Sequence, residues 1–264
     1  MGLKLNSTRE TYQEFCGRNV EQMPKLIADG RVPMNVSQLM QRRLDVRDSD
    51  AKVKSSYMDN YFDTGDAVLY HLDGRVKIVL DSQTLRDMTL ETQRVGGALL
   101  IGEDVYNSLE GEEFKKGKLG KTEGPLLRED VKAHPVWKIL ARDQGLLNDY
   151  ADYIFSEVKE RFGYDTAMGV YPDSAKDNPK MRAWCIFSLK ERSNAHGNII
   201  LDSFFNGRFV GIAQKALSVP GKGASNIKAY TMADLQAVDK AMKGLETTVR
   251  PELLEPFVEL RKKL

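Results

Sequence analysis

The chain has 264 residues, 41% of them hydrophobic and 29% charged, so it can bury a sizeable core and needs neither disulfides nor a structural metal to fold. Lysine and arginine number 39 against 38 aspartates and glutamates, and the resulting charge of +1 gives no strong signature of nucleic-acid binding. The two cysteines, Cys16 and Cys185, are too few for a disulfide-stapled secreted scaffold. Short apolar runs and the lack of a signal-peptide pattern predict a soluble, cytoplasmic protein with no membrane attachment.

The first part of the chain is predicted to be helical. Ser7 and Glu10 have the spacing of a capping box, which predicts a helix that runs to about Gly17. A second short helix is expected over residues 21–29, because a glycine follows it as a stop signal. A third is expected over residues 36–44, where apolar side chains recur at helical spacing and fall on one face.

A β-hairpin is predicted next. Residues 67–72 and 75–81 have the pattern of strands, and they flank Asp73 and Gly74, a strong signal for a two-residue turn. A third short strand is expected over residues 98–101. The chain is therefore expected to change from helix to sheet in this region.

Residues 111–125 contain four glycines, one proline and few apolar side chains. This composition predicts a linker or long loop between a first segment, residues 1–110, and an α+β domain at residues 126–264. The sequence leaves open the alternative of a single continuous domain that carries a long surface loop.

Helices and then strands are predicted beyond this segment. Pro135 opens one helix, and the longest helix is expected over residues 144–162. Strand candidates follow at residues 167–171, 181–189, 199–205 and 208–214. Asn206 and Gly207 give the last two strands a hairpin turn, and two C-terminal helices close the chain.

The predicted fold class is α+β, because runs of strands are separated by runs of helices instead of alternating with them. The expected order is N-terminal helices, a β-hairpin region, a central long helix, a second antiparallel β region and two C-terminal helices.

The hairpin brings two acidic residues together. With a two-residue turn, Asp66 faces Asp81 directly, and Lys77 lies on the same face of the sheet. Like charges in this position are destabilising unless a cation or a shared proton offsets them. Paired carboxylates suit Mg²⁺ or Mn²⁺, which take oxygen ligands. The sequence therefore offers Asp66 and Asp81 as metal ligands, with Lys77 and Gln83 as assisting residues.

This arrangement resembles the core hairpin of the PD-(D/E)xK nuclease superfamily. In that family an Asp on one strand and an (Asp or Glu)-x-Lys on the next strand bind a metal and activate water. The resemblance covers residues 66–83 and implies metal ligation by Asp66 and Asp81, with Asp45 as a further acidic group. Gln83 stands where the family has lysine, and Lys77 is the substitute on the same face. The alternative interpretation is that both carboxylates are solvated residues at strand ends.

The three histidines lack the spacing of a zinc motif. His71 is expected to be a structural residue of the hairpin, His134 a cap or surface residue at a helix start, and His196 a residue of a polar loop, where a histidine can be catalytic. No other catalytic signature is present. The sequence therefore favours a soluble intracellular binding or interaction protein, with a protein partner or self-association, and its alternative is a metal-dependent hydrolase of the nuclease type.

Overall fold

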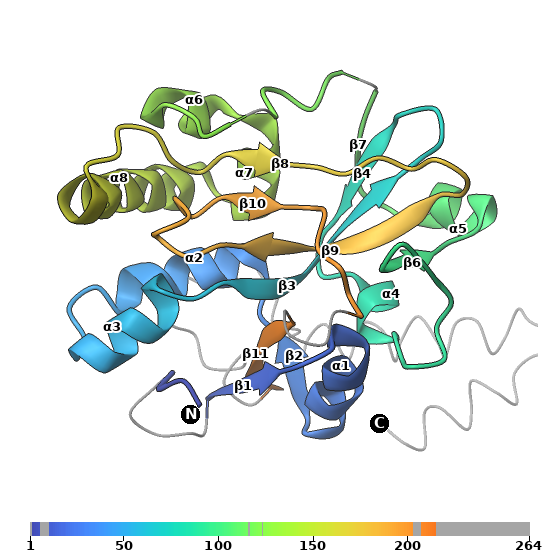
Figure 1. Ribbon diagram of the computed structural model, residues 1–264, viewed down its shortest axis with the longest axis horizontal. Coiled ribbons are helices and arrows are strands. Elements are labelled where there is room, and N and C mark those ends of the chain that lie inside the picture. The colour runs from blue at the N-terminus through green and yellow to red at the C-terminus, as the bar shows by residue number, and fades with distance from the viewer. Residues whose placement is uncertain (1, 6–10, 116, 123, 203–206, 215–264) are drawn as a thin grey trace, which may run out of the picture. The chain divides into compact units, whose positions relative to one another are not determined.

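The computed structural model describes residues 2–5, 11–115, 117–122, 124–202 and 207–214. The chain divides into two units, Met1–Val219 and Pro220–Leu264, and the second lies outside the described residues, as do the predicted C-terminal helices. The fold is α+β, as predicted, with helices packed on a mixed sheet (Figure 1). Within the described part, none of the helices is both long enough and apolar enough to cross a bilayer.

The elements have the following bounds. The helices are α1 (Asn19–Ala28), α2 (Val36–Asp45), α3 (Ala51–Met58), α4 (Gln83–Arg86), α5 (Glu103–Ser108), α6 (Arg128–Ala133), α7 (Pro135–Ala141) and α8 (Gln144–Phe162). The strands are β1 (Tyr12–Cys16), β2 (Arg31–Pro33), β3 (Phe62–Tyr70), β4 (Val76–Val79), β5 (Arg94–Val95), β6 (Ala98–Leu100), β7 (Glu112–Phe114), β8 (Val170–Tyr171), β9 (Lys180–Ile186), β10 (Ala195–His196) and β11 (Arg208–Ala213).

The spine of the sheet runs in the order β1-β11-β3-β9-β10-β8. The pairs β11–β3 and β10–β8 are parallel, and the other pairs are antiparallel. The shorter strands extend this spine: β2 pairs with β11, β4 joins β3 to β7, and β6 joins β9 to β5. Because β7 belongs to this sheet, residues 111–125 carry a strand, and the sheet takes strands from both sides of that segment.

Strand β3 lies between two apolar cores. Val68 and Tyr70 face the core that contains α2, α7 and α8, whereas Ala67 and Leu69 face the core that contains α1 (Figure 1). Alternate side chains of one strand point to opposite faces of a sheet, so residues 67–70 of this strand, which is covered on both sides, are all apolar, whereas its first half buries the polar side chains of Asp63, Thr64 and Asp66. Strand β3 is accordingly buried along its whole length.

Residues 12–16 form β1, and the prediction of a helix there is wrong. The strand pairs with β11 over its full length, from Tyr12 opposite Ile212 to Cys16 opposite Arg208, and Phe15 is buried in the core. Pairing with a strand nearly two hundred residues away outweighs the local capping signal, because tertiary context overrides weak propensity. The residues of that signal lie outside the described part.

The predicted strand at residues 199–205 is absent at residues 199–202, and residues 203–206, which include Asn206 of the predicted turn, lie outside the described part. The described residues of this segment do not pair with residues 208–214, so the predicted hairpin is wrong there. This segment instead connects α1 to the turn between β5 and β6. The backbone N–H of Leu201 donates to the carbonyl of Gly97 in that turn, and the carbonyl of Leu201 accepts from the backbone N–H of Val20 in α1. The neighbours of β11 are β1, β2 and β3.

The β3–β4 turn has three residues, Leu72 to Gly74, one more than predicted. The backbone N–H of His71 donates to the Arg75 carbonyl, and Leu69 pairs with Lys77. Gly74 has a φ of 86°, which is the left-handed glycine that three-residue hairpin loops require. The register is therefore shifted by one residue, and the predicted direct pairing of the two acidic residues is wrong.

A bulge in β3 redirects the chain toward α2. The pairing of β3 with β9 shifts between Asp63 and Ala67. A Cβ at Gly65 would lie 3.1 Å from the ring and 3.2 Å from the carbonyl oxygen of Pro33, so only glycine fits without displacing β2. The backbone of Gly65 bonds to Met34 and Ser82 instead of to β9.

Three helices whose start or end residues could be recognised in the sequence form where they were predicted. Asn35 and Gln38 make a reciprocal capping box at the start of α2. Helix α8 has the predicted bounds, and Gly163 ends it with a φ of 72°. Pro135 opens α7, also as predicted.

Candidate functional site

The carboxylates of Asp66 and Asp81 lie close together, and Arg142 bridges them. Its Nη2 is 2.7 Å from Asp66 Oδ1, and its Nη1 donates to Asp81 Oδ2. Asp66 is fully buried, whereas the side chain of Asp81 is 38% exposed. The guanidinium thus supplies the positive charge that the sequence analysis assigned to a metal ion.

The two carboxyls differ in proton affinity because they differ in burial. Burial raises the pKa of Asp66, although Arg142 and the backbone N–H groups of Val36 and Asp81 oppose that rise. Asp81 is also partly desolvated, but hydrogen bonds from Arg142 and Asn35 hold its pKa below the usual range. We expect the buried carboxylate to be the one that depends more on Arg142.

Both Asp81 and Arg142 have left-handed backbone conformations, with φ of 49° and 64°. Such conformations cost free energy for residues other than glycine and persist only where the surroundings enforce them. Arg142 is the C-cap of α7, so this ion pair joins the end of α7 to the hairpin and to the N-terminus of α2. The geometry is that of a structural clamp between three elements.

Lys77 and Gln83 do not join this cluster. The one-residue register shift places Lys77 on the opposite face of the sheet, where its Nζ donates to the carbonyls of Tyr106, 2.7 Å away, and Leu109. Gln83 is the exposed first residue of α4 and bonds to Asp87. Across the residues that the structure describes, no group of three or more His, Cys, Asp or Glu side chains is placed to hold a metal.

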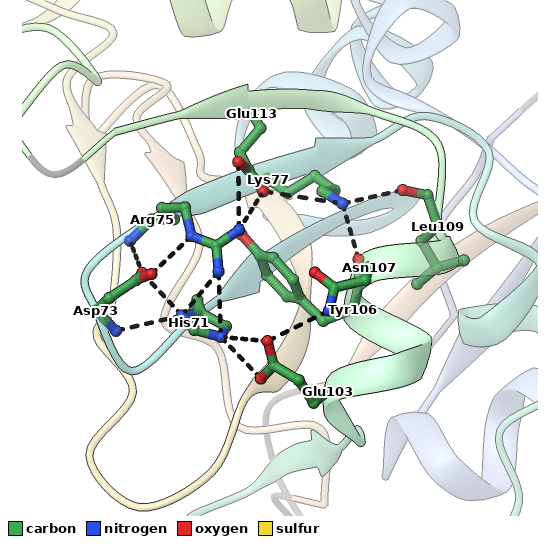
Figure 2. A network of polar contacts seen from close by, with 9 residues as sticks. All are labelled: His71, Asp73, Arg75, Lys77, Glu103, Tyr106, Asn107, Leu109 and Glu113. Atoms are coloured by element: carbon green, nitrogen blue, oxygen red, sulfur yellow. Dashed lines mark hydrogen bonds and ion pairs between the residues drawn. The ribbon is translucent and has the colours of Figure 1, made fainter.

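Lys77 belongs to a polar network that joins the hairpin tip to α5 and β7. Figure 2 shows His71 between two carboxylates, with Asp73 Oδ1 2.8 Å from its Nδ1 and Glu103 Oε2 2.8 Å from its Nε2. Arg75 connects Asp73 to Glu113 across the same network (Figure 2). His71 is therefore a structural residue of the hairpin, as the sequence indicated.

His196 lies in strand β10, not in a loop, and it stacks between two other rings. Its ring centroid is 4.6 Å from that of Tyr171, with the planes only 16° apart, and 4.1 Å from that of Phe187. The strand pairing explains this arrangement, because His196 is opposite Tyr171 on β8 and opposite Cys185 on β9. Sequence analysis noted His196 alone and missed the two aromatic residues, which come from other segments.

These rings line a wide, open depression of about 430 Å³ on the protein surface, which is called a pocket below. Its lining residues are Pro125, Tyr171, Phe187, Lys190, Glu191, Arg192, Asn194 and His196. Burial lowers the pKa of His196, which favours the neutral imidazole near pH 7. A neutral ring among aromatic neighbours, with charged side chains at the rim, has the composition of a small-molecule binding site.

Arg43 lies under the loop that carries the pocket residues. Its side chain is fully buried, and each of its N–H groups has an acceptor on the protein. The acceptors are the carbonyls of Tyr57, Asn60 and Phe187 and the hydroxyls of Tyr150 and Ser193. Arg43 thus fixes both ends of the loop from residue 187 to residue 193.

Asp63 is buried beside Cys185, one strand away from the pocket. Burial raises the pKa of Asp63 to about 6, and the hydrogen bond from the backbone N–H of Arg208 to its Oδ2 only partly offsets that rise. Asn19 and Cys185 also act to lower this pKa, although neither forms a hydrogen bond of normal geometry with Asp63 Oδ1 in the described part. Burial also raises the pKa of the Cys185 thiol. Asp63 therefore destabilises the folded protein when it is charged.

This leads to a prediction for Asp63→Asn. Because the folded-state pKa of Asp63 is raised, the contribution of this residue to stability is most favourable below its unfolded-state pKa, near pH 4, and is lost as pH rises through about 6. The amide cannot ionise, so we expect the variant to be more stable than wild type by up to about 3 kcal/mol at pH 7 and equal to it near pH 4. Urea unfolding between pH 4 and pH 7 measures this. Asp48→Asn, at a side chain that is 85% exposed, is the control and should follow wild type; an Asp63→Asn curve parallel to wild type would contradict the prediction.

Comparison with known proteins identifies the fold and no family. No family model matches the chain, and no curated protein matches it in sequence. A solved structure entitled "Accommodation of massive sequence variation in Nanoarchaeota by the C-type lectin fold" superposes with a TM-score of 0.57 and 16% sequence identity, over 79% of this chain and 100% of that chain. The protein thus shares its fold with a C-type lectin-fold structure.

Proposed function

We propose that this protein is a non-catalytic binding protein whose ligand occupies the pocket of Tyr171, Phe187 and His196, which we call the aromatic pocket. The stack of three rings in a pocket of about 430 Å³ carries the proposal. Ligand pockets typically measure a few hundred Å³ and combine aromatic walls with a few polar groups. Arg43 supports this role, because it holds the pocket loop rigid at its base.

The fold neighbour adds a second argument. That structure is described as a C-type lectin fold that accommodates massive sequence variation. A fold can accommodate such variation when buried residues form a constant frame and the surface side chains change. In this chain Arg43 and the buried strands would form the frame, and the side chains of the aromatic pocket would form the changeable surface. Binding sites on such surfaces differ between proteins of one fold, so the ligand has to be argued from this chain's own residues.

The three histidines provide a test, since each reports on a different region. His196 lies in the aromatic pocket, His71 in the hairpin network and His134 at the start of α7. We expect a screen of small molecules by NMR to yield compounds that move the ring signals of His196 and leave those of His71 and His134 in place.

Tyr171→Ala is the control for this screen. It removes one wall of the pocket and should weaken every compound that moves the His196 signals. A library in which no compound moves these signals, or in which Tyr171→Ala binds as well as wild type, would contradict the proposed function.

The hydrolase alternative requires Asp66 and Asp81 to exchange Arg142 for a metal ion. Both oxygens of Asp66 already accept hydrogen bonds from the protein, so the exchange would cost several interactions. We expect millimolar Mg²⁺ or Mn²⁺ to leave the melting temperature of wild type unchanged, because a ligand stabilises a protein only by binding its folded state. A rise in melting temperature that disappears in Asp81→Ala would favour the hydrolase instead.

A further inference from the structure

Resting on the proposed function, we infer the class of ligand: the aromatic pocket takes a small molecule in which a flat ring is joined to an anionic group. Two chemical sources have this combination, namely a mononucleotide and an aromatic carboxylic acid. The ring is recognised by the stacked side chains of the pocket, and the anionic group by the cations at its rim.

The stacked rings favour a flat ligand. The imidazole of His196 is stacked on Tyr171 at 4.6 Å and lies 4.1 Å from Phe187 at a tilt of 35°, so the three rings form one aromatic cluster. Such a cluster can bind a flat aromatic ligand by offset stacking on a ring face or by contact with a ring edge, which carries partial positive charge. All three side chains are partly exposed, so their edges are accessible.

The rim favours an anion. Lys190 is exposed and forms no hydrogen bond or ion pair with the rest of the described chain. Arg192 packs over the ring of Tyr164 at 4.2 Å and faces no carboxylate in the part of the protein that the structure covers. The one acidic lining residue, Glu191, already accepts a hydrogen bond from the hydroxyl of Ser188. Glu191 keeps its negative charge in that hydrogen bond, and Arg192 also donates to the hydroxyl of Thr166. With Lys190 and Arg192 against one carboxylate, positive charge is in excess at the rim.

The experiment compares whole ligands with their parts. Adenosine monophosphate carries a ring system and an anion, and its parts are adenosine and inorganic phosphate. Phenylacetate is the second whole ligand, and its parts are benzyl alcohol and acetate. We expect at least one of the two whole ligands to bind about tenfold more tightly than its parts, by calorimetry and by the His196 signals, and its affinity to fall with added salt. Which of the two binds distinguishes a nucleotide from an aromatic acid.

Variants separate the ring contribution from the charge contribution. Lys190→Gln removes a free surface charge, so it should fold normally, weaken the anionic ligand several-fold and leave adenosine unchanged. Tyr171→Ala should weaken both. Lys138→Gln, another exposed lysine away from the pocket lining, is the matched control and should have no effect.

The outcomes distinguish this inference from the proposed function. Phosphate that binds as tightly as adenosine monophosphate, or anionic ring compounds whose affinity survives Lys190→Gln, would overturn the ligand class. If an uncharged compound moves the His196 signals and neither anionic ring compound does, the ligand class is wrong and the binding function stands. If no compound moves them, both are wrong.

Discussion

Replacing Arg43 by lysine is expected to lower the free energy of unfolding by about 3 to 5 kcal/mol, since it leaves a buried polar site half satisfied. Arg43 is fully buried, and its guanidinium donates to carbonyls and hydroxyls from α3, α8, the residues before β3 and the pocket loop. An ammonium has three donors on one atom and cannot reach acceptors that lie on several sides. Urea unfolding at pH 7 measures the loss.

Two further variants make this prediction specific. Arg43→Met keeps the side chain long and removes the charge, and it should also be destabilised because it leaves all the acceptors of the guanidinium without their donor. Arg47→Lys, at a side chain that is 60% exposed, should change stability by less than about 0.5 kcal/mol. A loss below about 1 kcal/mol in Arg43→Lys would show that water replaces the missing donors.

Arg43 contributes to the shape of the aromatic pocket as well as to the stability of the protein. Its contacts with the Phe187 carbonyl and the Ser193 hydroxyl hold the loop on which three of the charged pocket residues lie. In folded Arg43→Met we therefore expect the His196 ring signals to shift even without ligand, while those of His71 stay in place.

The parts of the fold that sequence could predict are those with complete local signals. Helix α8 has an apolar face, Asp143 as N-cap and Gly163 as its stop, all within one stretch of chain. Helix α2 has its capping box for the same reason. Residues 12–16 differ because their structure depends on β11, a partner that no local pattern specifies.

The hairpin shows how a correct element can have the wrong register. Asp73 and Gly74 indicate a turn, but Asp and Gly suit both two-residue and three-residue loops. The side chain of Asp73 accepts a hydrogen bond from the Arg75 backbone, which stabilises the longer loop. One residue of difference moves Lys77 to the other face of the sheet, and with it the network of Figure 2.

Each candidate site combines residues that are close together in the sequence with residues that are far apart in it. Sequence analysis could predict only the first kind. Asp66 and Asp81 do lie together, although through the β3 bulge and not through direct pairing. Their partner Arg142 comes from the end of a helix 76 positions after Asp66, and nothing in its own surroundings points to the hairpin. The aromatic pocket likewise draws residues from β8, β10 and the segment after β9.

The second large effect is expected for Arg142→Gln, which should lose about 3 to 5 kcal/mol at pH 7, because it leaves the carboxylate of Asp66 buried without its cation. Burial already raises the pKa of Asp66 in the presence of Arg142, and removing the guanidinium raises it further. The loss should therefore be largest at neutral pH and shrink toward pH 4, where the carboxyl is protonated and needs no counter-ion. Asp81 should strengthen this dependence on pH. Arg142 lowers the pKa of Asp81, so the stability that comes from this pair is present at neutral pH and is lost as Asp81 is protonated.

A double-mutant cycle tests whether Arg142 acts by compensating the charge of Asp66. If it does, removing both charges should lower the free energy of unfolding less than removing Arg142 alone. We expect Asp66→Asn to recover part of the stability lost in Arg142→Gln, because the amide carries no charge that needs compensation. The recovery is only partial: Val36 and Asp81 donate to different oxygens of Asp66, and the single amide oxygen can accept from just one of these backbone N–H groups. In the wild-type background the same Asp66→Asn should destabilise, since it leaves Arg142 with Asp81 alone. Equal effects of Asp66→Asn in the two backgrounds would mean that Arg142 and Asp66 are not coupled, and that the clamp at the end of α7 depends on Asp81 instead.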